Sequence, residues 1–361
     1  MRYMPVDFLK ETHMLAQPIY DTNFNEQLLA TSDLTTSRIK ALKRLGYYSV
    51  YIRDEKYASD EQSVTTEMLR NLYVEVAHVF TIIKTSSKLI SKNKIGLLSI
   101  DQAKHLEESF NVLMKIGEEV ILYLLKDRSP NIHLFETKSI DLYSIQHAVH
   151  TSIYAVKMGL KRNLNMRALK NLFIGAILHD IGYMLIHDFD TTKIGLLNES
   201  QKELQSKHAQ FTVDILNQCN NITSVTKTIC LQHHEKEDGT GYPNRLDSKS
   251  INPLTKLLAI SITYDALTSD RPFRPAYPIH KAIQIVKNQV GTAYDSLSFE
   301  LLEEMIVPFP IGTVVKINNE LGTITSYETQ PKYPVVVMED GQTVKLTDYR
   351  SMSIGLNYRD T

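Results

Sequence analysis

The chain has 361 residues, of which 43% are hydrophobic, and this is enough for two or three domains of ordinary size with buried cores. Its 40 Lys and Arg residues nearly balance 41 Asp and Glu residues, so no overall charge attracts a nucleic acid polymer or an anionic membrane surface. Only two cysteines are present, and no stretch reaches the roughly 18 apolar residues of a membrane span, so we expect a cytoplasmic protein without membrane insertion.

Residues 1–58 have the pattern of a small α+β unit. Short β-type runs come first, and a helix follows whose N-cap is Thr35 or Thr36. Gly46 stands where a glycine commonly ends a helix, and the run from Tyr47 to Ile52 then has the pattern of a strand.

Residues 59–137 are expected to form a helical hairpin, or stalk. Apolar residues at alternating spacings of three and four give each helix one packing face. The two faces consist of Leu69, Leu72, Val76, Val79 and Ile83, and of Leu106, Phe110, Leu113, Val120 and Leu124. Two roles are open: the stalk can join two copies in a homodimer or relay a signal, or the hairpin can cover the helical domain that follows.

Residues 138–306 are expected to be helical apart from polar loops at 189–199 and 235–250, and residues 307–361 to form a small β-rich tail. The predicted fold is therefore mainly α. The helical domain holds the candidate metal ligands His147, His179, Asp180, His208, His233 and His234. Imidazoles and a carboxylate without thiolates suit a divalent transition metal better than a structural zinc site.

Asp180 follows His179 at the end of an apolar helical run, LKNLFIGAILHD. Because an unpaired carboxylate in a core is costly, an aspartate there implies a cation, a salt partner or a capping role. Taken alone, this pair has the ordinary interpretation of a helix-end cap beside a satisfied histidine. The adjacent pair of His233 and His234, taken alone, is also ambiguous between a structural role and a ligand role.

Three strings together carry a resemblance to a known family. They are HDIG from His179 to Gly182, HHEKEDGTGYP from His233 to Pro243, and YDALTSDRPFR from Tyr264 to Arg274. This combination resembles the HD-GYP domain, a branch of the HD metal-dependent phosphohydrolases, over residues 138–306. The segments around His147 and His208 are similar to two ligand-bearing helices of that family, and the flanking units are similar to those of many HD-GYP proteins.

The resemblance implies a phosphodiesterase that acts on cyclic di-GMP. One or two divalent ions, Fe or Mn in preference to Ni, Co or Zn, would be held by the six candidate ligands, with Asp180 as the bridging and catalytic carboxylate. A metal-bound hydroxide would open the cyclic dinucleotide to pGpG, and in some members to GMP.

The expected substrate contacts are Gly241, Tyr242, Pro243, Asp265, Arg271 and Arg274. The glycine permits close backbone approach, and the tyrosine ring can stack on guanine. The two arginines can bind phosphate or a guanine edge through paired hydrogen bonds. Considered separately, this loop has the composition of an ordinary turn, and isolated loop arginines are more often surface charges.

Three positions depart from the family pattern. Tyr183 replaces a lysine expected near the scissile phosphate, and Ile262 replaces an aspartate that normally ligates metal, while Asp265 matches a second aspartate one turn on. Tyr143 stands where some members have a glutamate for a third ion, so we do not expect a third ion. Two hypotheses remain open: a phosphodiesterase with weakened activity, and a catalytically degenerate module that binds cyclic di-GMP or metal and signals to a partner.

Overall fold

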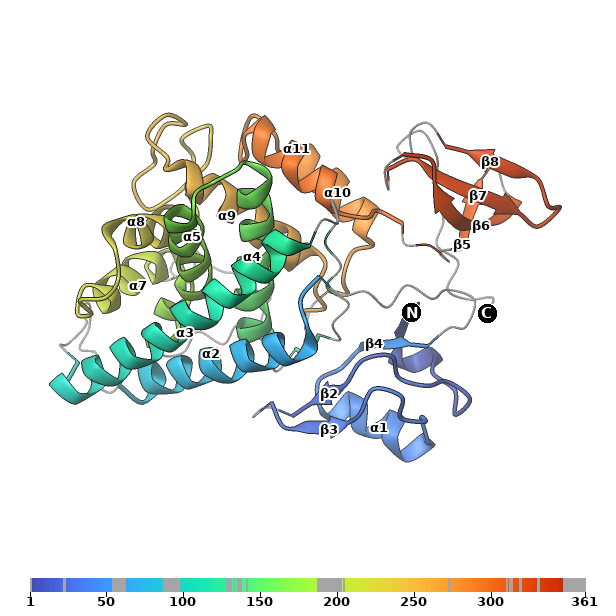
Figure 1. The fold of residues 1–361 in the computed structure, drawn as a ribbon, viewed down its shortest axis with the longest axis horizontal. Coiled ribbons are helices and arrows are strands. Elements are labelled where there is room, and N and C mark those ends of the chain that lie inside the picture. Colours follow the sequence, from blue (N-terminus) through green and yellow to red (C-terminus); the bar gives the residue numbers. More distant parts are fainter. Residues whose placement is uncertain are drawn as a thin grey trace.

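The protein consists of a helical body with a small α+β unit near its N-terminus and a four-stranded sheet towards its C-terminus, as a computed structural model shows (Figure 1). The predicted mainly helical fold is confirmed. The structure describes residues 2–21, 24–53, 63–86, 98–127, 132, 134, 138–140, 142–186, 203, 205–271, 274–309, 311, 314–317, 320–329 and 332–346. The polar loop expected at 189–199 lies outside these residues.

The N-terminal unit is built from two short antiparallel strand pairs and one helix. Its elements are β1 (Arg2–Pro5), η1 (Val6–Phe8), β2 (Ile19–Tyr20), β3 (Glu26–Leu28), α1 (Thr36–Arg44) and β4 (Ser49–Ile52), with β1 paired to β4 and β2 to β3. The Thr35 side chain caps α1 by accepting a hydrogen bond from the Arg38 amide. Gly46, at φ 75°, turns the chain after the helix as its position predicts.

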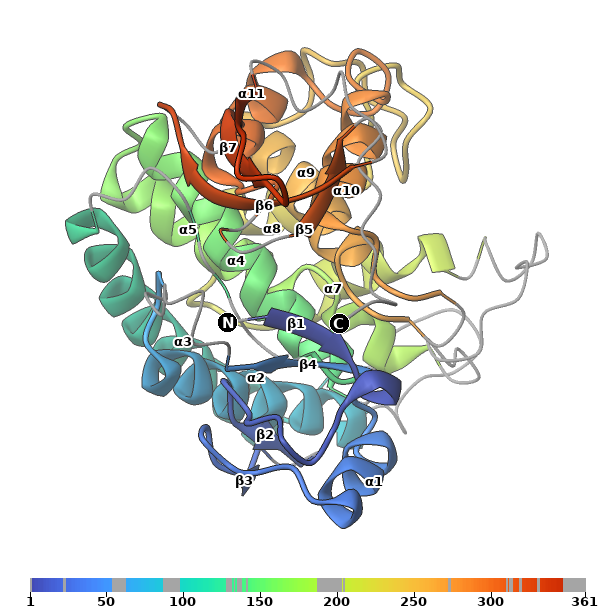
Figure 2. The same ribbon diagram turned by 90° about the vertical axis from the view of Figure 1, so that its right-hand side faces the viewer.

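The helical hairpin consists of α2 (Thr66–Ser86) and α3 (Ile100–Lys126), which lie side by side along one flank of the body (Figures 1 and 2). A reciprocal capping box between Ser99 and Gln102 starts α3. The apolar faces of both helices are buried in the same core as the helices that follow. The packing is that of a cover, because the face predicted for a dimer seam is already filled by this chain.

The helical body is organised around α4 (Tyr143–Lys161), whose residues are buried on all sides from Gln146 to Gly159. The chain then forms α5 (Met166–Leu178), η3 (Ile181–Leu185), α7 (His208–Leu216), α8 (Ser224–Gln232), α9 (Pro253–Leu267), α10 (Ile279–Lys287) and α11 (Ser296–Met305). Helices α2, α5, α9 and α11 all pack on α4. Since α4 is enclosed on every side, a polar side chain on it must find its partner inside the protein.

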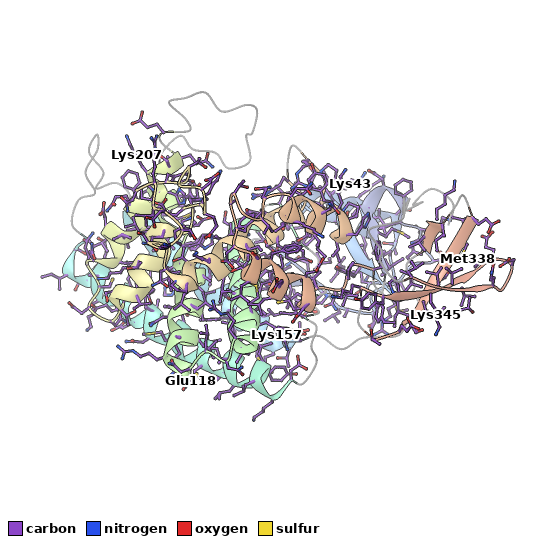
Figure 3. The ribbon with its side chains drawn as sticks, turned by 90° about the horizontal axis from the view of Figure 1, so that it is seen from above. Lys43, Glu118, Lys157, Lys207, Met338 and Lys345 are labelled. Atoms are coloured by element: carbon purple, nitrogen blue, oxygen red, sulfur yellow. The ribbon has the colours of Figure 1, made fainter. Side chains whose placement is uncertain are left out.

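The C-terminal sheet has its own small core, built around Phe309, Val315, Ile324, Val336 and Met338. Its antiparallel strands follow the chain order β5 (Val314–Ile317), β6 (Glu320–Tyr327), β7 (Pro334–Met338) and β8 (Thr343–Lys345). Seen from above, this sheet and the outer helices of the body lie at opposite ends of the molecule (Figure 3). Among the described residues, none of the helices combines the length and apolarity that crossing a bilayer requires.

The packing of α3 on α5 gives a stability prediction at Gly117. A Cβ atom at this position would lie 2.4 Å from the ring of Phe173, which is itself buried. Changing glycine to alanine inside a helix normally stabilises it by about 0.5–1 kcal/mol, whereas overpacking a core costs about 1–3 kcal/mol. We therefore expect Gly117→Ala to lower the free energy of unfolding, measured by urea denaturation.

Glu119→Ala is the matched control, because Glu119 is exposed on the same helix. This substitution should change the free energy of unfolding by no more than about 0.5 kcal/mol. If Gly117→Ala proved as stable as the unchanged protein, α3 and α5 would not be packed as closely as described.

Candidate metal centre

Six side chains from separate elements meet at one end of the helical body. His147 lies on α4, His179 and Asp180 follow the C-terminal end of α5, His208 is the first residue of α7, and His233 and His234 follow the C-terminal end of α8. The ligand atoms form two groups, each within 4.8 Å: Asp180 with His208, His233 and His234, and Asp180 with His147 and His179. All six predicted ligands are thus brought together, and Asp180 belongs to both groups.

The carboxylate of Asp180 faces both groups with different oxygens. Its Oδ2 lies 3.3 Å from His179 Nε2, while its Oδ1 lies 3.3 Å from His208 Nε2 and 3.6 Å from His233 Nε2. A quarter of this side chain is exposed, whereas His179 and His208 are fully buried. The arrangement suits a carboxylate that bridges two cations and remains accessible to a ligand from outside.

Hydrogen bonds fix which nitrogen of each buried imidazole faces the cluster. The Nδ1–H groups of three histidines donate to the carbonyl oxygen three residues earlier. These pairs are His179 with Ala176, His208 with Gln205, and His233 with Cys230. Since a carbonyl only accepts, each Nδ1 carries the proton and each Nε2 presents a lone pair, the form that binds metal.

The lone pairs have no adequate partner within the described part of the chain. His208 Nε2 and His233 Nε2 lie 3.1 Å apart, and both are acceptors when their Nδ1 atoms carry protons. His179 Nε2 is buried and makes no hydrogen bond to the described residues. Facing acceptors and an unsatisfied buried nitrogen are unfavourable without a cation, so this donor set fits divalent metal ions.

Burial and neighbouring charges shift the pKa values of several groups in the cluster. Burial lowers the pKa of His147 and that of His233, and it lowers the pKa of His234 to about 3. Burial would raise the pKa of Asp180, but the neighbouring imidazoles of His179 and His208 hold it well below its usual range. Burial would also lower the pKa of His179, but the charge of Asp180 and its hydrogen bond raise it. The lowered pKa values leave His147, His233 and His234 as neutral imidazoles at neutral pH, so a metal need not displace a proton from these three rings.

Hydrogen bonds of Gly182 and Thr212 hold α7 against the turn that contains Asp180. The Gly182 amide donates to Thr212 Oγ1, and this hydroxyl donates to the His179 carbonyl, both at 3.0 Å. A Cβ at Gly182 would lie 2.1 Å from the carbonyl oxygen of His208. Glycine is therefore required because backbone passes directly over it, and this contact sets His208 beside Asp180.

Tyrosine rings stack on three of the cluster imidazoles. Tyr143 lies on His147 with ring centroids 5.0 Å apart, Tyr183 on His208 at 4.0 Å, and Tyr242 on His234 at 4.5 Å. Burial raises the pKa of all three phenols, so they remain neutral hydrogen-bond donors. Tyr183, at the position where a lysine was expected, therefore supports the ring of a predicted ligand.

The loop after His234 is held against the cluster by Glu235, a residue for which the sequence motifs predicted no role. Its buried carboxylate accepts hydrogen bonds from the amides of Asn244 and Leu246 at 2.7 and 2.9 Å. A Cβ at Gly241 would lie 2.5 Å from the Glu235 Cα atom and from the His234 carbonyl oxygen. These contacts place Tyr242 on His234, and Pro243 follows through a cis peptide bond.

The remaining predicted substrate contacts lie in different surroundings. Arg271 lies with its guanidinium carbon 3.4 Å from the ring centroid of Tyr143 and donates to its hydroxyl, so it flanks the cluster. The guanidinium of Arg274 instead donates to carbonyl oxygens at the end of α9 and at Pro275. Asp265 is fully buried behind His147, where a substrate cannot reach it directly.

Comparison with known families identifies the class of this centre. Residues 124–297 match the HD domain family, and this segment contains every member of the cluster. This part of the chain is therefore an HD domain, a domain of metal-dependent phosphohydrolases. With its HDIG and HHEKEDGTGYP strings, it is an HD domain of the HD-GYP type, which confirms the resemblance drawn from the motifs.

Several curated bacterial proteins are similar to this chain. Cyclic di-GMP phosphodiesterase PA4108 of Pseudomonas aeruginosa is 26% identical over 247 residues, which are 67% of this chain and 59% of that protein. The 3'3'-cGAMP-specific phosphodiesterase 3 of Vibrio cholerae is 31% identical over 48% of this chain and 38% of its own length. The chain thus spans less than two thirds of these relatives.

Among solved structures, the chain is similar to Bd1817, an HDG"Y"P protein from Bdellovibrio bacteriovorus. The TM-score is 0.44 at 15% sequence identity, covering 84% of this chain and 98% of that one. The HD domain of the phosphodiesterase PgpH of L. monocytogenes matches 45% of this chain with a TM-score of 0.34.

The shared carboxylate leads to a prediction about metal content. We expect the purified protein to bind two divalent ions per chain, Asp180→Asn to lose both, and His147→Ala to lose one. The reason is that Asp180 belongs to both ligand groups and His147 to a single group. Inductively coupled plasma mass spectrometry after equilibrium dialysis against Mn²⁺ measures the stoichiometry. Loss of equal numbers of ions from the two variants would contradict a shared carboxylate.

Proposed function

We propose that this chain is a metal-dependent phosphodiesterase that opens cyclic di-GMP to linear pGpG. The observation that carries the proposal is the two-sided cluster around Asp180, in which Nδ1 hydrogen bonds turn Nε2 of His147, His179, His208 and His233 towards the cluster. Similar curated proteins from Pseudomonas aeruginosa and Borreliella burgdorferi are named cyclic di-GMP phosphodiesterases. A degenerate module has less support, because all six predicted ligands converge despite the departures at Tyr183 and Ile262.

In this proposal His147 and His179 would hold one ion, His208, His233 and His234 would hold the other, and Asp180 would serve both. Fe or Mn is the preferred metal, because the donors are imidazoles and a carboxylate without thiolates. When bound, two such ions neutralise phosphate oxygens and lower the pKa of a coordinated water.

The chain's own groups would orient the nucleotide around these ions. The Tyr242 ring, held on His234, offers an edge or face to a guanine, and Gly241 and Pro243 shape the adjoining backbone. Arg271 brings a fixed positive charge to the His147 side, where it can contact a phosphate. Tyr183 supplies a hydroxyl near Asp180 but no charge.

Cyclic di-GMP is the first substrate to test, and 3'3'-cGAMP is the second. Three of the similar proteins, all from Vibrio cholerae, are named 3'3'-cGAMP-specific phosphodiesterases. The two nucleotides differ in one base, so the phosphate chemistry is common to both and the base contacts decide between them. We place the activity in the cytoplasm, where the free, buried Cys219 and Cys230 stay reduced.

The direct test uses Mn²⁺- or Fe²⁺-loaded protein incubated with cyclic di-GMP and, separately, with 3'3'-cGAMP. We expect cyclic di-GMP to be converted to pGpG, detected by anion-exchange chromatography, and a chelator or Asp180→Asn to abolish the conversion. Later appearance of GMP would show that hydrolysis continues. A metal-loaded preparation that leaves both nucleotides intact for hours would reject the proposal.

Two of the three departures from the family pattern, Tyr183 and Ile262, give a prediction about rate. In Tyr183→Lys an ammonium replaces the phenol, and a charge-assisted hydrogen bond contributes about 1.4 kcal/mol more than a neutral one, which corresponds to about tenfold in rate. Ile262→Asp adds a carboxylate and should tighten the binding of one ion. We expect the double variant to exceed the unchanged protein in kcat by about tenfold or more. An unchanged or lower kcat would mean that neither position limits turnover.

A further inference from the structure

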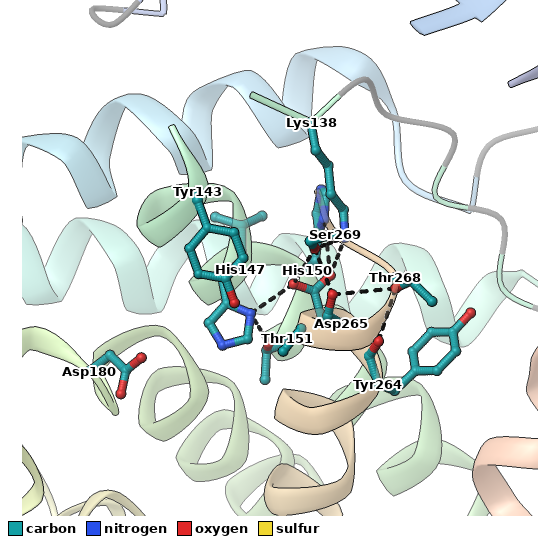
Figure 4. A network of polar contacts seen from close by, with 12 residues as sticks. Lys138, Tyr143, His147, His150, Thr151, Asp180, Tyr264, Asp265, Thr268 and Ser269 are labelled. Atoms are coloured by element: carbon teal, nitrogen blue, oxygen red, sulfur yellow. Dashed lines mark hydrogen bonds and ion pairs between the residues drawn. The ribbon is translucent and has the colours of Figure 1, made fainter. Parts of the chain in front are cut away.

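A buried ion pair lies directly behind the metal cluster. The carboxylate of Asp265 on α9 is fully buried, and its Oδ1 lies 2.5 Å from the ammonium of Lys138 (Figure 4). Its Oδ2 accepts the Nδ1–H of His147 at 2.7 Å. Lys138 also donates to Ser269 Oγ at 2.8 Å, so this ammonium is fixed by two partners from α9 and the loop that follows.

The two carboxylate oxygens of Asp265 have different partners. Without a nearby cation, a fully buried carboxylate is costly and would turn towards any available donor. Here Lys138 engages Oδ1 and leaves Oδ2 for His147. The Nδ1–H of His147 is thereby committed to Asp265, and its Nε2 is left with a lone pair on the side of Asp180.

Lys138 is itself set in place from the N-terminal unit. The Ser139 hydroxyl donates to the Leu45 carbonyl at 2.8 Å, and the Ile140 amide donates to the Gly46 carbonyl at 3.0 Å. The Ser139 amide also donates to Oε1 of Gln146, the residue before His147, at 2.9 Å. The backbone next to Lys138 is therefore anchored both to the N-terminal unit and to α4.

A second chain of contacts reaches Asp265 from the same unit. His150 Nδ1 lies 3.4 Å from Asp265 Oδ1, and the Tyr73 hydroxyl lies 2.8 Å from His150 Nε2. The Tyr73 ring in turn stacks on Phe24 with centroids 5.0 Å apart. Asp265 is thus enclosed by residues of the hairpin and the N-terminal unit as well as by α4.

We propose that Lys138 is a positioning residue of the metal centre: by holding Asp265, it fixes His147 in the orientation and tautomer that ligate an ion. The inference rests on the proposed metal-dependent function, but it concerns this chain's own residues. It also gives Asp265 a role other than that of a substitute ligand for the position of Ile262. Both of its oxygens are already engaged, so Asp265 orients a ligand instead of replacing one.

The test compares Lys138→Met with Lys157→Met in the full-length chain. Lys157 is a matched control, since its ammonium pairs with Asp127 at 3.0 Å and its side chain is 5% exposed, on α4 but outside the cluster (Figure 3). Calorimetric titration with Mn²⁺ gives the number and affinity of bound ions. The visible absorption of the Co²⁺-loaded protein reports the ligand geometry of each ion, independently of any nucleotide hydrolysis.

We expect Lys138→Met to lower the affinity for one of the two ions by roughly 10–100-fold, as loss of a group that orients a metal ligand commonly does. The Co²⁺ spectrum should change as well. Lys157→Met should bind both ions like the unchanged protein. Lys138→Gln, which keeps a donor but no charge, provides a second variant if the methionine protein does not fold. Unchanged binding of both ions by either folded Lys138 variant, or the same loss in Lys157→Met, would overturn the proposal.

Failure of the proposed function is distinguishable from failure of this inference. If no nucleotide is cleaved but Lys138→Met still loses affinity for one ion, the positioning role of Lys138 is supported and the proposed phosphodiesterase reaction is rejected. If cyclic di-GMP is cleaved and Lys138→Met binds and cleaves like the unchanged protein, the reaction stands and the positioning role falls.

Discussion

The structure depends on one electrostatic constraint: an ionised carboxylate shared by two groups of imidazoles inside a helical core. Asp180 has the surroundings to remain charged, with His179 on one side and His208 on the other. Five histidines around one carboxylate provide many lone pairs and little negative charge. Cations satisfy both needs at once, since they bind the lone pairs and offset the buried anion.

Helix ends supply the geometry that this constraint demands. The last carbonyls of a helix lack intrahelical partners, and His179 and His233 use such carbonyls at the ends of α5 and α8 as acceptors for their Nδ1–H groups. The same bond that satisfies the backbone also turns Nε2 towards the cluster. His147 lies within α4, where no carbonyl is free, and it therefore needs the side chain of Asp265 for the same purpose.

The sequence was sufficient to predict the helical class, the start and end of α1, and the six members of the cluster, because these follow from local patterns and from strings of adjacent residues. It was not sufficient for Lys138 or for the true surroundings of Asp265. Those two residues are separated by 127 positions, and their contact depends on how the N-terminal unit packs beside α4. The apolar face of α2 was also compatible with a dimer seam, since periodicity shows that a face is buried but not what covers it.

The departures from the family pattern also have a consistent physical consequence. Tyr143 and Tyr183 bring uncharged rings that stack on His147 and His208. These rings shield the imidazoles from water, which strengthens the interaction between any bound ion and an incoming phosphate. With Asp180 as the single carboxylate shared by the two ligand groups, two divalent ions leave an excess of positive charge, to which Arg271 adds. Such a centre would favour a ligand with more than one negative charge, and the proposed substrate, a cyclic dinucleotide, has two phosphodiesters.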